Sequence, residues 1–280
     1  MDSEITGSSM IGVSIILPTY RNPEYLDICL RSLTENQKNE IIVVVDGFLE
    51  LSESVLTKYP GINVITLQNN MGMQHAINIG VMQATSKYVC VANDDNVFPE
   101  NFDARLKQEI VKCESQYGDK FVLTINQVEP TGPGMFNHAV EDFGRTASSF
   151  RYDDWMKDEL LISKPDQNEN GHIFPFVVAK KYYLAVGGLD TFYDSPNVCD
   201  WDLFLKWELL NFHFPRTHAL HLYHFGSVTT RSGPDASLFR NREIEALQTY
   251  EYKWGAKPYN EPITNSKIPP DKMFRGFFYE

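Results

Sequence analysis

Two adjacent carboxylates, Asp94 and Asp95, follow the short apolar run of residues 88–92. Such a run is typical of a central parallel strand, and open α/β sheets bind their ligands at the carboxyl ends of these strands. An Asp pair in this place is commonly a solvated turn or a helix cap. It also suits chemistry, because carboxylate oxygens bind Mg²⁺ or Mn²⁺, and such a cation can carry a diphosphate.

Further polar residues stand where other predicted strands end. The first strand is followed by Thr19, Tyr20 and Arg21, the second ends at Asp46, and the third precedes the segment 69–72. Carboxyl ends of parallel strands meet at one edge of a sheet, so these residues should converge on one crevice. These segments would supply a turn, a cation, an acid and a helix start whose amides can face phosphate. Such a set resembles a nucleotide pocket.

Composition narrows the class of protein. The chain has 280 residues, 42% of them hydrophobic, which is enough to bury a substantial core. Its formal net charge of -12 argues against nucleic acid as a partner, because a phosphate backbone requires a concentrated positive field. The polar start is unlike a signal peptide, and no apolar run is long enough to span a bilayer. We expect a soluble cytoplasmic protein, with peripheral membrane contact left open. The four cysteines are expected to be reduced structural thiols.

Strand and helix patterns alternate along most of the chain. Apolar runs bounded by turn residues predict strands at 13–17, 40–45, 62–67, 87–92, 121–125, 173–178 and 218–225. Helical spacing predicts helices at 23–33, 51–58, 73–85, 102–117, 180–186, 200–211 and 238–252. Among the apolar residues expected to face the core are Ile79, Met82 and Val111. This order predicts a doubly wound, mostly parallel α/β sheet. The stretch 126–171 lacks periodicity and is expected to be irregular.

Six blocks of sequence, in order, resemble those of family 2 glycosyltransferases with the GT-A, Rossmann-like fold. The blocks are residues 14–21, 42–47, 70–80, 93–96, 186–203 and 223–227. The resemblance extends over about 11–232 and implies a single domain there, with a nucleotide-binding half at 11–125 and an acceptor or catalytic half at 126–232. Residues 1–10 are expected to be loosely ordered. Residues 233–280 are expected to form a C-terminal helix and a tail that wraps the domain.

The resemblance also implies a reaction. A sugar would move with inversion from a nucleotide-diphosphate sugar, with a UDP-sugar favoured, to the hydroxyl of a carbohydrate or glycoconjugate acceptor, as in glycan or polysaccharide assembly. Asp200 matches the general base, although an Asp here also suits a helix N-cap. Mn²⁺ or Mg²⁺ would be held by Asp95, Asp94 and His224, with His221 as the fallback. The residues expected to bind the nucleotide are Pro18, Thr19, Tyr20, Arg21, Asp46, Asn70, Gln74, His75 and Asp94. Trp155 and Trp201 are candidates for stacking on the acceptor.

The chain departs from the family pattern at three positions. Ala92 stands where the acid block usually opens with Asp, Cys199 replaces the Glu before the base, and Ile77 replaces an Arg. These changes keep open a glycan- or nucleotide-binding protein that has lost turnover. A sugar-phosphate nucleotidylyltransferase is a further alternative, but that class requires a Gly-rich basic loop after the first strand, and residues 18–22 are not one.

Overall fold

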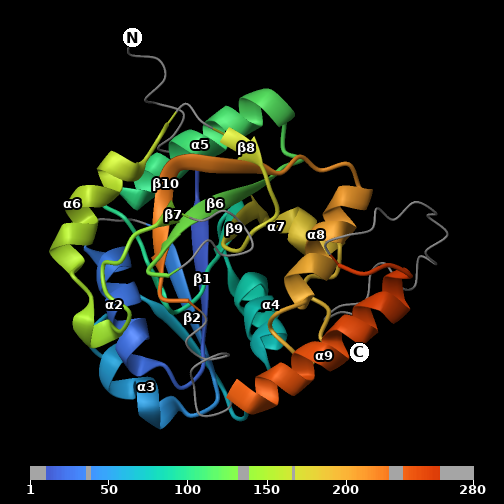
Figure 1. Ribbon diagram of the computed structural model, residues 1–280, viewed down its shortest axis with the longest axis horizontal. Coiled ribbons are helices and arrows are strands. Elements are labelled where there is room, and N and C mark those ends of the chain that lie inside the picture. The colour runs from blue at the N-terminus through green and yellow to red at the C-terminus, as the bar shows by residue number, and fades with distance from the viewer. Residues whose placement is uncertain (1–10, 36–38, 132–138, 166–167, 227–235, 259–280) are drawn as a thin grey trace.

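The computed structural model describes residues 11–35, 39–131, 139–165, 168–226 and 236–258. The predicted loose segment 1–10 and the last part of the predicted tail, 259–280, lie outside these ranges. Figure 1 shows one central sheet with helices on both of its faces, as the alternation of strands and helices predicts. No helix in the described ranges is long and apolar enough to cross a membrane.

The first half of the chain forms a parallel part of the sheet. Its strands are β1 (Val13–Thr19), β2 (Glu40–Asp46), β3 (Asn63–Leu67) and β4 (Tyr88–Val91), in the order β3-β2-β1-β4. All adjacent pairs among them are parallel. The connecting helices are α2 (Pro23–Thr34), α3 (Leu49–Leu56) and α4 (Met73–Gln83). The strands β1 and β4 are buried along their whole length, because helices cover both faces of the sheet.

The second half adds strands of both directions. They are β5 (Asn96–Val97), β6 (Val122–Glu129), β7 (Ala139–Val140), β8 (Asn168–Asn170), β9 (Phe176–Ala179) and β10 (Pro215–His224). The strand β9 lies between β4 and β6 and is antiparallel to both, whereas β10 is parallel to β6. The strands β1, β2, β4, β6 and β10 therefore run in one direction. Their carboxyl ends meet at one edge of the sheet, as predicted.

The helices of the second half are α5 (Phe102–Tyr117), α6 (Tyr152–Ile162), α7 (Lys180–Ala185), α8 (Cys199–Leu209) and α9 (Ala236–Trp254), with a 3-10 turn at Ala147–Ser149. The helix α6 corrects the expectation that 126–171 is irregular. Only Trp155 and Glu159 of α6 are buried, and its exposed Leu160 and Leu161 obscure the apolar spacing of a helix.

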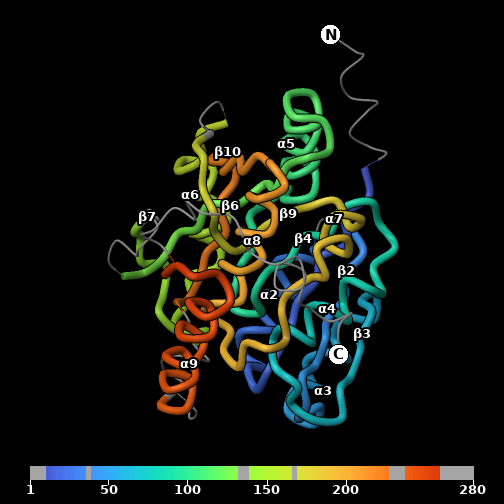
Figure 2. The backbone as a smooth tube through the Cα atoms, turned by 90° about the vertical axis from the view of Figure 1, so that its right-hand side faces the viewer, coloured from blue at the N-terminus to red at the C-terminus, as the bar shows by residue number. Residues whose placement is uncertain are grey.

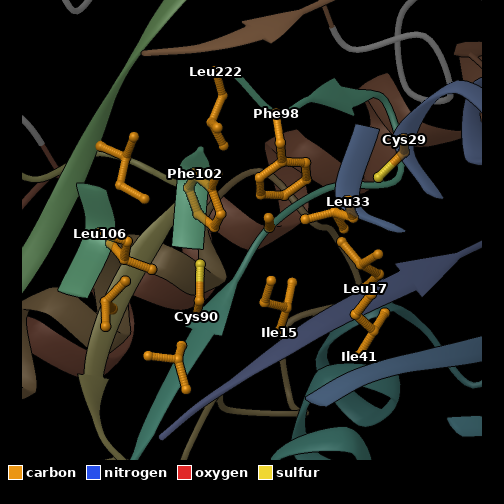
Figure 3. Packing of buried hydrophobic residues seen from close by; sticks show 14 of the residues in the cluster. Ile15, Leu17, Cys29, Leu33, Ile41, Cys90, Phe98, Phe102, Leu106 and Leu222 are labelled. Atoms are coloured by element: carbon orange, nitrogen blue, oxygen red, sulfur yellow. The ribbon is translucent and has the colours of Figure 1, made fainter. Parts of the chain in front are cut away.

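Two cores lie on the two faces of the sheet. The first core packs α2, α3 and α5 against one face, and Leu17, Leu33, Cys90 and Phe102 are among its buried members (Figure 3). The second core packs α4, α7, α8 and α9 against the other face. The helix α9, red in Figures 1 and 2, forms the outer layer of that side.

Several side-chain predictions can be checked against these cores. All four cysteines are free and buried, as expected. Met82 and Val111 were expected to face the core, but both are exposed. Each lies one position beyond the buried stripe of its helix.

Candidate functional site

The acid pair lies in the connection between β4 and β5. Asp94 and Asp95 are 7% and 5% exposed, so two carboxylates are buried side by side. The Thr19 hydroxyl, at the end of β1, donates a hydrogen bond of 2.7 Å to Asp94 Oδ2. Burial, and secondarily the charge of Asp95, raises the pKa of Asp94 to about 7. A nearby positive charge would therefore favour the ionised form of Asp94 at neutral pH.

His224 supplies a partner for this pair from the opposite side of the edge. It is the last residue of β10, and its Nε2 lies 3.5 Å from Asp95 Oδ1. Its Nδ1 lies 2.8 Å from Oε1 of Glu129, the last residue of β6. The imidazole thus stands between two carboxylates, one on each ring nitrogen.

Glu129 was not among the predicted site residues. The strand that carries it was expected to end at residue 125, whereas β6 continues to Glu129. The polar residues Asn126 and Gln127 interrupt the apolar run, but both are buried. The signal that could have found Glu129 is its place beside His224, because β10 and β6 are parallel neighbours that end together.

These residues suit a hard divalent cation. Asp95 and His224 offer a carboxylate oxygen and an imidazole nitrogen, and a carboxylate on the second ring nitrogen is the usual partner of a metal-binding histidine. In the described ranges, no set of three or more His, Cys, Asp or Glu side chains is grouped closely enough to hold a metal by itself. Such a cation would therefore take its remaining ligands from diphosphate and water, which is common for Mg²⁺.

His221, the fallback ligand, belongs elsewhere. Its Nδ1 lies 3.4 Å from Ser163 Oγ and 3.7 Å from Glu159 Oε1. Glu159 in turn forms a bidentate ion pair with Arg105, at 2.6 and 3.0 Å. The fallback prediction was wrong because His221 and His224 are three residues apart on a strand, so their side chains point to opposite faces.

Asp46, the last residue of β2, orders the loop before α4 at the same edge of the sheet. Its carboxylate accepts hydrogen bonds from the amides of Met71 and Gly72, at 2.6 and 2.9 Å, just before α4. Asn70 Oδ1 also accepts from the Gly72 amide, at 3.0 Å. Burial raises the pKa of Asp46, and the hydrogen bonds from the Met71 and Gly72 amides, followed by His75 in the first turn of α4, partly offset this rise. Asp46 is thus a loop-forming residue, and its contact with a base remains a prediction.

Arg21 and Tyr20 follow β1 beside an exposed aromatic ring. The Arg21 guanidinium lies 5.0 Å from the centroid of Phe48, and the Tyr20 ring meets Phe48 edge-on at 5.8 Å. Phe48 is 42% exposed and directly follows the β2 turn. Sequence reasoning did not single it out, although an exposed aromatic at a strand end is a recognisable signal for a stacking surface.

Gln74 was predicted to bind the nucleotide, but its side chain is used elsewhere. It is buried, and its amide nitrogen donates to the carbonyls of Tyr193 and Ser195, at 2.8 and 2.7 Å. Both donors are therefore used to hold the loop that precedes α8. Asn78, one turn further along α4, holds the same loop through the carbonyl and the amide of Leu189, at 2.8 and 3.0 Å.

Asp200 is the second residue of α8, not its N-cap, which is Val198. One carboxylate oxygen accepts a hydrogen bond of 3.0 Å from the Trp201 amide. Burial raises the pKa of Asp200 to about 7, so the carboxylate is basic enough to accept a proton at neutral pH. Cys199, which replaces an acid in the family pattern, is fully buried and contributes no charge there.

Trp155 does not face an acceptor. It is fully buried and packs against Phe143 and Tyr223, with ring centroids 5.4 and 5.5 Å apart. The acceptor prediction was wrong because Trp155 anchors α6 to β10. Trp201 is partly exposed in the first turn of α8, so its acceptor role remains a prediction.

Fold and site together define a class. A mostly parallel α/β sheet covered by helices, with acids and a histidine at the edge where its parallel strands end, is the GT-A architecture. Residues 14–142 match the family model described as glycosyl transferase family 2. This part of the chain is similar to that family, as its sequence blocks indicated, and TarS of S. aureus shows the same fold.

Individual known proteins show the same similarity. Glycosyltransferase GlyG of Streptococcus pneumoniae is 26% identical over 104 residues, which are 35% of this chain and 35% of that protein. Amylovoran biosynthesis glycosyltransferase AmsE of Erwinia amylovora is 32% identical over 104 residues, 35% of this chain and 39% of its own length. The crystal structure of S. aureus TarS in complex with UDP has the same fold, with a TM-score of 0.55 and 16% identity over 88% of this chain and 76% of that one.

These matches cover only part of this chain and part of each relative. The match spans between 18% and 41% of the length of these curated relatives. The family model ends at residue 142 and thus includes Asp46, Asp94, Asp95 and Glu129. Asp200 and His224 lie beyond it.

Proposed function

We propose that the protein is an inverting glycosyltransferase that moves a sugar from a nucleotide-diphosphate sugar to the hydroxyl of a carbohydrate or glycoconjugate acceptor. The observation that carries the proposal is the convergence of Asp95, His224 and Glu129 at the sheet edge where nucleotide ligands bind. The family match and the glycosyltransferase names of the relatives support it. A uridine nucleotide is favoured, since TarS has the same fold and was crystallised with UDP.

The donor would lie along this edge. The nucleoside would face Arg21, Phe48 and Asp46, and its diphosphate would approach Asp95 and His224. A bound Mn²⁺ or Mg²⁺ would neutralise the diphosphate as it leaves. Glu129 would keep the His224 Nε2 lone pair directed at this position by accepting the Nδ1 proton.

Asp200 would act on the acceptor. With a pKa of about 7, its carboxylate would accept the proton of the acceptor hydroxyl as that oxygen attacks the anomeric carbon. The bond to the diphosphate breaks on the opposite face, so the anomeric centre is inverted. General-base assistance of this kind typically contributes about 10²- to 10⁴-fold to the rate.

A binding protein without turnover is the second candidate, and one observation favours it. Ala92 is fully buried, and no acid stands at that position of the block. This candidate predicts nucleotide-sugar binding without hydrolysis or transfer.

A thermal-shift panel of nucleotides and nucleotide sugars, with and without Mn²⁺ or Mg²⁺, tests both candidates. Ligand at 100 times its Kd should stabilise the protein by about 2.7 kcal/mol. Slow metal-dependent hydrolysis of the same donor would support the enzyme and exclude the binding protein. If no nucleotide or nucleotide sugar shifts the melting temperature, both candidates are refuted.

A further inference from the structure

A buried charge cluster joins α9 to the first turn of α8. We define the α8–α9 charge cluster as Asp190, Asp202, Lys206 and Lys253. Lys253 Nζ lies 2.6 Å from Asp202 Oδ1 and 2.7 Å from Asp190 Oδ2. Lys206 Nζ lies 3.1 Å from Asp202 Oδ2 and donates to the carbonyl of Gly188, also at 3.1 Å. Two positive and two negative charges are thus balanced within one cluster.

Asp202 is the centre of this cluster. It is fully buried, and its Oδ1 also accepts hydrogen bonds from the Trp254 indole at 2.7 Å and the Tyr193 hydroxyl at 3.0 Å. Two of the four groups that hold Asp202, Lys253 and Trp254, come from the end of α9. A buried carboxylate held by so many donors has one defined position, because leaving any of them unpaired would be costly.

The cluster adjoins the proposed base. Asp202 is two residues after Asp200 in the same helical turn, and this helix start has no side-chain cap of its own, since its N-cap is Val198. A helix start that lacks a cap depends on tertiary contacts for its position. The loop before it is held by Gln74 and Asn78 on the α4 side. The α9 side is held by Lys253.

We infer that Lys253 is a positioning residue for the transfer reaction: α9 locks the first turn of α8 through Asp202, and thereby places the Asp200 carboxylate. This inference rests on the proposed function. The C-terminal helix is then a working part of the transferase, although it lies outside the family match at 14–142. A misplacement of about 1 Å in a reacting group typically costs about 10²-fold in rate.

Three variants test the inference. Lys253→Met removes the α9 cation. The double variant Asp190→Asn/Lys253→Met removes one charge of each sign and leaves the Asp202–Lys206 pair balanced, so we expect it to fold even if the single variant does not. Arg242→Met is the matched control, because Arg242 also lies on α9 but pairs with the 71% exposed side chain of Asp194.

Two measurements distinguish a positioning role of Lys253 from a general contribution to the stability of the fold. Hydrogen exchange should become faster in residues 199–205 of the double variant and stay unchanged in β1. With the best donor of the panel, the donor KM should stay within about twofold, while kcat falls by about 10- to 100-fold, as expected for a misplaced group. Arg242→Met should match the wild-type protein in both measurements.

Three outcomes would overturn the inference: unchanged exchange at 199–205, equally increased exchange throughout the sheet, or wild-type kcat in a variant whose α8 start has loosened. Failure of the proposed function has a different signature. If the wild-type protein turns over no donor, the transferase proposal fails, and a role of Lys253 in transfer fails with it even where the exchange result holds.

Discussion

Replacing Asp200 by Asn is the most direct test of the proposed chemistry. The Asn side chain has the same shape and keeps an oxygen for the Trp201 amide, so the start of α8 should be preserved. Its amide does not accept a proton at neutral pH. We expect transfer to fall by about 10²- to 10⁴-fold. Nucleotide binding should persist, because the residues proposed to contact the nucleotide lie at the ends of β1, β2 and β4.

The same substitution should increase stability at alkaline pH. Burial raises the pKa of Asp200 from 3.8 to about 7, so between these values the folded protein keeps a proton that the unfolded chain releases. Stability contributed by this group is therefore full below about pH 4 and is lost as the pH rises through about 7. At 1.36 kcal/mol per pKa unit the loss is at most about 4 kcal/mol, and partial exposure of Asp200 reduces it to about 1–2 kcal/mol.

Urea unfolding at about pH 5 and about pH 8, with donor turnover measured on the same samples, provides the assay. The Asp200→Asn variant should gain more stability over the wild-type protein at the higher pH than at the lower one. Asp194→Asn is the matched control, because Asp194 lies in the loop before α8 but is exposed. Full transfer activity in Asp200→Asn would exclude Asp200 as the base. An equal stability gain at both pH values would refute the reasoning from burial.

Two further predictions concern residues that only the structure identified or corrected. Glu129→Gln should weaken Mn²⁺ affinity, measured by titration calorimetry with the nucleotide present, by about 10- to 100-fold, because His224 loses the carboxylate that orients it. Unchanged Mn²⁺ affinity would exclude this role, and the exposed Glu141→Gln is the control. Trp155→Ala should lose about 3–5 kcal/mol of unfolding free energy through a core cavity, with donor kcat and KM unchanged in the folded protein. A variant that keeps its stability but no longer uses acceptor would instead restore the predicted acceptor role of Trp155.

Much of the fold could be predicted because its signals are local. Short apolar runs and helical spacing follow from the periodicities of strands and helices, and these identified β1 to β4 and their helices. Parallel strands then bring Thr19, Asp46 and Asp94 to one edge. The helix α6 was missed because it has only two buried side chains, too few for a periodic pattern.

The sequence by itself therefore determined the class of fold, the resemblance to family 2 glycosyltransferases and the edge of the sheet at which its polar residues gather. Tertiary structure alone decided which of those residues meet. Glu129 and His224 are 95 positions apart, and Gln74 reaches a loop 119 positions away. Lys253 contacts Asp190 across 63 positions. These pairs depend on the order and direction of strands and on how helices pack over them, and neither leaves a periodic signal in the chain.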